Sequence, residues 1–187
     1  ATGRIFERLH VPGVELQPLE LLEPEAGEDL PAYALRLAGA HGLPSGGFIG
    51  GCSFGGMLAA EIALQRGARA CIQIGSALSP RQIPPHLRLA QRLSRVLPDA
   101  VLERFPKDSR LLLRYFNPVG EAERALIVEM GRFASTKLVR RGSRMILRWQ
   151  GVTKLPCPPF IIHGARGRLI RPPRQEELPR EAVCEIV

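Results

Sequence analysis

The sequence predicts an α/β fold in which helices on both faces cover a mostly parallel β-sheet. Strand-like apolar runs alternate with helix-like runs between residues 29 and 75. A further apolar run, Phe160–Gly164, follows a long stretch of helix-like sequence at residues 80–152. The 187 residues are enough for a sizeable core, so we expect one domain over residues 1–187.

The first two expected strands lie near the N-terminus. Residues 4–9 alternate polar and apolar side chains, which is typical of a strand. Residues 14–22 indicate a second strand, with Pro18 at an edge or a bulge. From Asp29 onward apolar residues recur at helical spacing, which predicts a helix with Pro31 in its first turn.

The next elements form a strand–helix–strand unit. Gly47–Cys52 is a short apolar run that predicts a buried strand. The residues Met57–Gln65 favour a helix, and Gly67 offers its C-terminal cap. Residues 69–75 predict another buried strand. This alternation favours parallel strands joined by helical crossovers.

Residues 80–152 differ from the rest because they contain helix-like runs and no convincing strand. The expected helices cover residues 86–97, about 99–105, 108–116, 121–130 and 132–149. We interpret the segment as a helical cap inserted between two strands, with ordinary packing helices as the alternative. After it, the sequence predicts the strand of Phe160–Gly164, a short helix over residues 176–180 and a last strand over residues 182–187.

Composition indicates a globular protein. Hydrophobic residues make up 45% of the chain, and no apolar run reaches the roughly 18 residues of a membrane span. The first residues lack the apolar centre of a signal peptide. The four cysteines are widely spaced, so we expect neither a metal site nor disulfides, and we expect a cytoplasmic protein.

Positive charge is concentrated in the middle of the chain. The net charge is +8, and residues 81–150 hold 15 basic against 6 acidic residues. Such a segment can bind nucleic acid, but no run of aromatic residues accompanies it. We therefore expect the solvated faces of arginine-rich helices rather than a nucleic-acid partner.

A glycine-flanked serine joins the central strand to its helix. Gly51, Ser53 and Gly55 fit the pattern G-x-S-x-G, in which a sharp turn exposes a nucleophilic serine. The turn strains the backbone and brings strand and helix close together, so residues without a Cβ are needed beside the serine. The alternative is a glycine-rich turn with an incidental serine.

The chain resembles the α/β-hydrolase superfamily, specifically its small cytosolic esterase-like and thioesterase-like members. Three stretches carry the resemblance, in order along nearly the whole chain: Leu21–Glu25 with the helix after it, Gly51–Gly56 and Phe160–Ile170. The resemblance implies that Ser53 is the nucleophile. It also implies an oxyanion hole from the backbone N–H of Phe54, with Glu25 as the second donor because Pro24 has no N–H.

The chain departs from the superfamily pattern in two places. The late strand usually continues as His-Gly-x-x-Asp, whose aspartate orients the catalytic histidine, but Gly167 occupies that acid position and Arg171 that of a usual proline. The catalytic histidine of the superfamily follows the last strand, and this chain ends at Val187, where that loop should begin. The resemblance therefore implies an incomplete triad, through truncation or natural decay.

Another group would have to serve as the general base. His163 ends the late strand and is a structural residue in the superfamily, and it is the candidate substitute. The remaining histidines, which we expect at the surface, are His10, His41 and His86. Three carboxylates fall near the place of a displaced acid, and we expect them to be solvated: Glu176, Glu177 and Glu181.

Two functions remain open from the sequence. The first is a serine hydrolase that acts on a small-molecule carboxylic ester or thioester through an acyl-enzyme on Ser53, without cofactor or metal. The incomplete triad would impair or abolish this activity. The alternative is a non-catalytic protein that uses the pocket and the arginine-rich cap to bind an acyl or anionic ligand. A nucleotide-binding domain is disfavoured because neither G-x-G-x-x-G nor a P-loop occurs. The sequence predicts no oligomeric state.

Overall fold

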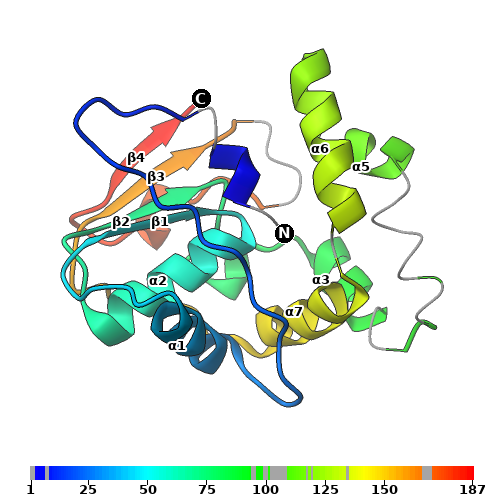
Figure 1. The fold of residues 1–187 in the computed structure, drawn as a ribbon, viewed down its shortest axis with the longest axis horizontal. Coiled ribbons are helices and arrows are strands. Elements are labelled where there is room, and N and C mark those ends of the chain that lie inside the picture. The colour runs from blue at the N-terminus through cyan, green and yellow to red at the C-terminus, as the bar shows by residue number, and fades with distance from the viewer. Residues whose placement is uncertain are drawn as a thin grey trace.

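The computed structural model describes residues 3–6, 9–93, 96–98, 101, 109–116, 118, 120–133, 135–165 and 170–187. At its centre is a four-stranded sheet whose strands follow one another in chain order (Figure 1). The strands are Phe48–Cys52 (β1), Ala70–Ile74 (β2), Pro159–His163 (β3) and Val183–Ile186 (β4). All neighbouring strands run parallel, which confirms the predicted α/β fold with a parallel sheet.

Two helices cover one face of this sheet. Helix α1 (Leu30–Ala40) begins where the Asp29 side chain accepts a hydrogen bond from the Ala32 N–H, and proline lies in its first turn as predicted. Helix α2 (Phe54–Arg66) is buried from Gly56 to Ala63 and ends at the predicted Gly67 cap. The two helices pack against each other, and α2 packs on β1 and β2.

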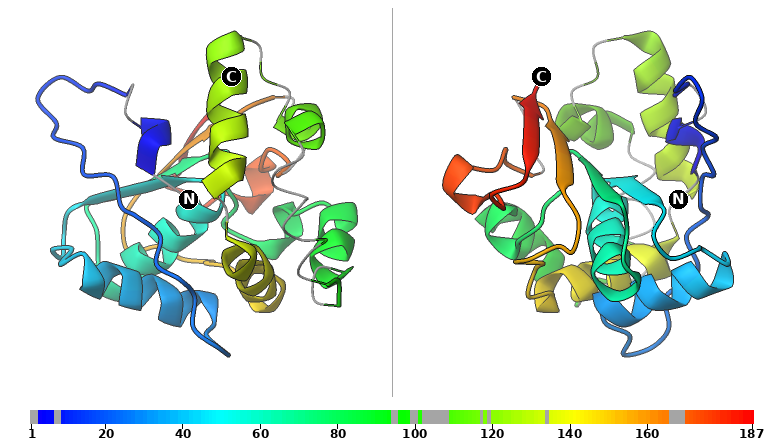
Figure 2. Two further views of the ribbon diagram at one scale, coloured as in Figure 1. Left: turned by 45° about the vertical axis from the view of Figure 1, so that its right-hand side comes forward. Right: turned by 90° about the vertical axis from the view of Figure 1, so that its left-hand side faces the viewer.

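The opposite face of the sheet is only partly covered. Side chains of β3 alternate between buried and exposed, and Phe160 and Ile162 are exposed at 41% and 38%. Phe48 of β1 and Val183 of β4 are also exposed. Helices were expected on both faces, but in the described part of the chain they cover one, since α1, α2 and α7 all lie on the same side (Figures 1 and 2).

The residues between β2 and β3 form the predicted run of helices. The described helices are α3 (Pro85–Leu93), α5 (Ser109–Phe116), α6 (Glu121–Phe133) and α7 (Thr136–Arg148), with a short 3₁₀ helix at Pro80–Gln82. The helix expected at about residues 99–105 lies almost entirely outside the described residues. Figure 1 shows α5 and α6 beyond the carboxyl ends of the strands, while α7 lies beside α1. Within the described ranges, no helix has the length and apolar character that crossing a bilayer requires.

A buried hydrogen bond ties the end of α7 to α2. The indole Nε1 of Trp149 donates to Oε1 of Glu61 at 2.6 Å, and both residues are about 4% exposed. Burial raises the pKa of the Glu61 carboxyl, while the Trp149 donor and Gln65 lower it again. The helical segment is therefore anchored in the core through its last residues.

Two predicted strands near the N-terminus are wrong. Gly3–Phe6 is a 3₁₀ helix, and residues 7 and 8 lie outside the described residues. Residues 14–22 have no regular structure apart from a single bridge between Val11 and Val14. A segment with alternating polar and apolar side chains becomes a strand only where it can pair with the edge of a sheet. Most of this stretch is exposed instead. The short helix expected at residues 176–180 is a 3₁₀ helix at Gln175–Glu177.

Candidate active site

Ser53 lies at the sharp turn between β1 and α2. Its φ of 53° and ψ of −120° make it the one residue other than glycine with positive φ in the described part of the chain. Such a backbone costs roughly 1–3 kcal/mol and persists only when the surroundings hold it. The strand, the strained serine and the helix together form a nucleophile elbow.

Close packing explains two of the glycines around the serine. A Cβ on Gly51 would overlap the carbonyl group of Gly55, which is backbone and cannot move aside. A Cβ on Gly56 would overlap the side chain of Ser76, and one on Gly55 itself would meet nothing within 4 Å. The turn therefore requires Gly51 and Gly56, whereas Gly55 contributes the backbone that Gly51 approaches.

Hydrogen bonds hold the Ser53 backbone in place. Its N–H donates to the Ile74 carbonyl at 3.0 Å, and its carbonyl accepts from the Ser76 hydroxyl at 2.7 Å. The buried Gln73 side chain donates to the Gly56 carbonyl at 2.7 Å in the next turn. Sequence reasoning missed Ser76 and Gln73. Their only local signal is that one polar residue lies within an apolar strand and the other just after it.

The backbone N–H of Phe54 begins α2 directly after the serine. In the described part of the chain no acceptor binds it, as is usual for the first N–H groups of a helix. Such an N–H can stabilise an oxyanion formed on an acyl group at Ser53. The Phe54 ring lies 6.2 Å from that of Tyr33, whose hydroxyl donates to the Leu22 carbonyl at 2.6 Å. Burial raises the pKa of Tyr33 to about 12, so its phenol stays a donor.

Tyr33 thus connects the elbow to the loop of residues 22–28, which contains the second expected oxyanion donor. The Glu25 N–H donates to the Glu28 carboxylate at 2.9 Å. Arg36 binds the same carboxylate at 2.7 Å and, with the Glu25 N–H and Arg141, lowers the pKa of Glu28. The Glu25 N–H is therefore already paired, and it would have to exchange this partner before it could bind an oxyanion.

His163 is the last residue of β3, and it is level with Ser53 across the sheet. The hydrogen bonds from Ser53 N–H to Ile74 and from Gly75 N–H to Ile162 continue the parallel register by one residue. Gly75, which has no side chain, therefore lies between Ser53 and His163, about two strand spacings or roughly 10 Å apart. His163 is buried, and no group in the described residues binds its Nε2.

The other candidate acid and base residues lie elsewhere or outside the described residues. His10 and His86 are exposed, and His41 Nε2 lies 2.9 Å from the Glu20 carbonyl oxygen. Three carboxylates expected to be solvated lie in or near the last 3₁₀ helix: Glu176, Glu177 and Glu181. Of these, Glu177 pairs with Arg171, which lowers its pKa. Gly167, at the expected acid position, lies outside the described residues.

Cys52 is the other potential nucleophile at the elbow, directly before Ser53. Burial raises the pKa of its thiol, and the other three cysteines show the same direction of shift. A raised pKa keeps a thiol protonated and unreactive near neutral pH. Burial therefore gives no sign that the Cys52 thiol is activated as a nucleophile.

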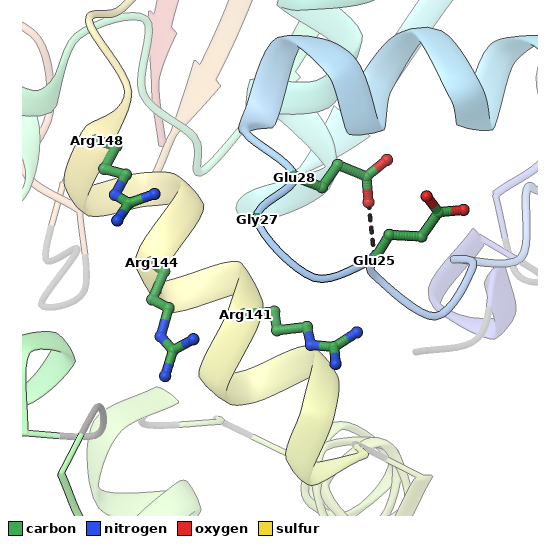
Figure 3. A pocket seen from close by; sticks show the side chains of 6 residues that line it. All are labelled: Glu25, Gly27, Glu28, Arg141, Arg144 and Arg148. Atoms are coloured by element: carbon green, nitrogen blue, oxygen red, sulfur yellow. Dashed lines mark hydrogen bonds between the residues drawn. The ribbon is translucent and has the colours of Figure 1, made fainter.

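A pocket of about 140 Å³ lies between α7 and the loop that contains Glu25 (Figure 3). It is lined by Glu25, Gly27, Glu28, Arg141, Arg144 and Arg148. Ser53 is not among these residues, so the pocket is separate from the elbow although the same loop borders both regions. In the described residues, no three side chains of His, Cys, Asp or Glu come together as metal ligands would.

Solved structures resemble this arrangement over most of the chain. A thermophilic esterase from Thermogutta terrifontis, with malate bound, matches 90% of this chain at a TM-score of 0.63 and 18% identity. An esterase from Exiguobacterium antarcticum matches 87% of it at 0.61 and 16% identity. MGS-M2, an α/β-hydrolase enzyme from a Medee basin deep-sea metagenome library, matches 88% at 0.60 and 14% identity. The chain has the α/β-hydrolase fold.

The chain spans only part of these α/β-hydrolase structures. It covers 66% of the length of each esterase and 65% of MGS-M2. No family model and no curated protein sequence matches the chain. Identities below 20% show the α/β-hydrolase fold and nothing of the substrate, so the chemistry of Ser53 has to be argued from its own surroundings.

Proposed function

We propose that this chain is a serine hydrolase that cleaves a carboxylic ester or a thioester of a small molecule. The observation that carries the proposal is the strained backbone of Ser53 at the turn from strand to helix. Strain of this kind costs free energy and is concentrated at functional sites. The names of the two similar esterases add support for ester substrates.

In the proposed mechanism, the Ser53 hydroxyl attacks the acyl carbonyl while a base takes its proton. The Phe54 N–H binds the oxyanion, and the Glu25 N–H can join it once it leaves the Glu28 carboxylate. Collapse of the tetrahedral intermediate expels the alcohol or thiol, which takes up a proton. Water then attacks the acyl-enzyme, releasing the carboxylic acid and restoring the serine.

The base is the weakest part of this machinery. In the described residues, no side chain forms a hydrogen bond with the Ser53 hydroxyl. His163 is level with Ser53 across the sheet, and its Nε2 has no partner in the described residues, so we assign the role of base to it. Without a base, only the acceleration from binding and the oxyanion hole remains, roughly 10³–10⁴ over water.

We further propose that residues 80–152 form a cap over the elbow within a single domain. Helices α5 and α6 stand beyond the carboxyl ends of the strands, the side at which Ser53 leaves β1 (Figure 1). A cap at this edge would enclose a substrate and exclude water. The four free cysteines suit a reducing compartment, and we place the protein in the cytoplasm.

The proposal is tested by reaction with a fluorophosphonate probe and with p-nitrophenyl acyl esters. We expect the wild type to be labelled and to release p-nitrophenol, and Ser53→Ala to do neither. Ser45→Ala, which removes an exposed loop serine, is the matched control and should behave as the wild type. Equal labelling and turnover by the wild type and Ser53→Ala would disprove the proposal.

A non-catalytic binding protein is the second candidate, because the Ser53 hydroxyl has no base in contact with it in the described residues. This protein would use the region around the elbow to hold an acyl ligand without cleaving it. The same experiment distinguishes the two functions. A wild type that neither reacts with the probe nor hydrolyses the esters, but binds them in a calorimetric titration, would favour the second candidate.

A further inference from the structure

Three arginines lie along one side of α7. Arg141, Arg144 and Arg148 are three and four residues apart, so they are neighbours on the helix surface. All three line the pocket that Glu25 and Glu28 border on the other side (Figure 3). The pocket therefore brings together charges more than 100 residues apart in sequence.

The carboxylates of the loop do not neutralise all of these arginines. Glu28 accepts hydrogen bonds from Arg36 at 2.7 and 2.8 Å, and Arg36 also lies 3.5 Å from Glu25. Arg141 donates to the Pro24 carbonyl. The carboxylates of Glu25 and Glu28 are thus paired with Arg36 of α1.

Arg144 and Arg148 remain without a partner in the described part of the chain. Both are exposed, and the two residues are four positions, or about one helical turn, apart on α7. Like charges at this spacing repel each other by roughly 0.2–0.5 kcal/mol. An anion bound between them would offset this repulsion and accept hydrogen bonds from the N–H groups of both guanidinium groups.

The geometry points to a ligand with a doubly charged oxyanion. A guanidinium group binds carboxylate or phosphate through two parallel hydrogen bonds, and two unpaired groups match a dianion better than a single carboxylate. The pocket volume of about 140 Å³ exceeds the roughly 10–15 Å³ that one ordered water requires, which leaves room for a hydrated oxyanion. We propose that Arg144 and Arg148 bind the phosphate or pyrophosphate group of a small soluble ligand in this pocket.

This site goes beyond the proposed hydrolysis, because Ser53 does not line the pocket. The two proposals can therefore fail separately. Phosphate binding would survive Ser53→Ala, and ester hydrolysis by Ser53 does not require a phosphate on the substrate. Exposed arginines also weaken as binding groups when salt screens them, so the measurement belongs at low ionic strength.

The test is a calorimetric titration of the full chain with sodium pyrophosphate at pH 8, where pyrophosphate is a multiply charged anion. We expect saturable binding of one pyrophosphate per chain. Binding should weaken by at least about tenfold in Arg144→Gln/Arg148→Gln, because glutamine cannot form the charge-assisted hydrogen bonds that each arginine would donate to the phosphate oxygens. Ser53→Ala should bind as the wild type does. Thermal unfolding would show that the double variant is folded, as expected for two exposed residues.

The matched control is Arg92→Gln/Arg124→Gln, which removes the same charge from exposed positions on α3 and α6. Unchanged binding in this control would assign the effect to the pocket, and an equal loss would reduce it to net charge and overturn the proposal. Absence of saturable binding by the wild type would also overturn it. So would binding to vesicles of phosphatidylglycerol without binding to pyrophosphate, since the arginines would then serve a lipid surface.

Discussion

Helices α2 and α7 both contain thirteen residues, but the protein uses them in opposite ways. Eight residues of α2 are buried and only Arg66 is basic in its last turn, whereas α7 buries Gly142 and Met145 alone and carries five basic residues. Helix α2 is held between the sheet and α1, and it begins at the strained serine. Helix α7 presents charge to solvent and to a pocket. The comparison separates a region fixed by packing from one defined by its surface charge.

The packing on the α2 side has a direct consequence for substitutions at the elbow. Gly51→Ala should be the most damaging change, because its Cβ would overlap the backbone carbonyl of Gly55. We expect a loss of about 3 kcal/mol or more in the free energy of unfolding, at the upper end of overpacking effects. Urea unfolding followed by circular dichroism measures it.

Gly55→Ala is the matched control for this prediction. A Cβ at Gly55 meets nothing within 4 Å, and alanine is favoured over glycine inside a helix by roughly 0.5–1 kcal/mol. The control should therefore be neutral or slightly stabilising. If the two variants lost equal stability, the steric account of the elbow would be wrong.

The elbow also shows how far the sequence could predict the site. Asp29 and Pro31 signal the start of α1, and G-x-S-x-G after an apolar run signals the turn at Ser53, because both are local patterns. Ser76 and Gln73 could not be found in this way, since their roles depend on β2 lying beside β1. Contacts of this kind become visible only when strand order and register are known.

The N-terminal residues and the arginine pocket show the same limit from the other side. Residues 14–22 have the alternation of a strand but no sheet edge pairs with them in the structure, so the local pattern was insufficient. The charge excess of residues 81–150 was evident, but not which arginines lack partners. That distinction depends on Arg36, which pairs with the Glu28 carboxylate, and on the Pro24 carbonyl, which accepts a hydrogen bond from Arg141.

The second prediction tests the hydrogen bond that joins the two regions. Trp149→Phe leaves the buried Glu61 carboxylate without its 2.6 Å donor, which should cost about 1–3 kcal/mol at pH 8. Burial raises the pKa of Glu61 in the folded state, so wild-type stability falls as pH rises from 4.5 through the folded pKa. Removing a donor to the ionised form raises that pKa further, and the cost should shrink toward pH 4.5.

Thermal unfolding between pH 4.5 and 8 measures this dependence, with Glu61→Gln as the control. Glutamine keeps an acceptor for the Trp149 N–H but cannot ionise. The difference between Glu61→Gln and Glu61→Gln/Trp149→Phe should therefore be independent of pH. A cost of Trp149→Phe that stays constant with pH in the wild-type background would mean that the indole acts by packing alone.

The smallest effect is expected on the exposed side of α7. Lys137 lies 2.7 Å from Glu23, but both side chains are more than half exposed, and exposed pairs contribute roughly 0–1 kcal/mol. Lys137 is also in the first turn of α7, where a positive charge is unfavourable by about 0.3–1 kcal/mol. These terms nearly cancel, so Lys137→Ala should change the free energy of unfolding by less than about 0.5 kcal/mol.

Arg36→Ala provides the contrast, because its carboxylate partner Glu28 has a side chain only 7% exposed. Removing Arg36 leaves the Glu28 carboxylate with the Glu25 N–H as its remaining donor and the Glu23 carbonyl without its Arg36 donor, and it should cost about 1–3 kcal/mol. Urea unfolding of both variants in low salt and in 0.5 M sodium chloride measures the difference. If Lys137→Ala proved as costly as Arg36→Ala, α7 would be held by its surface charges, and its contrast with α2 would no longer hold.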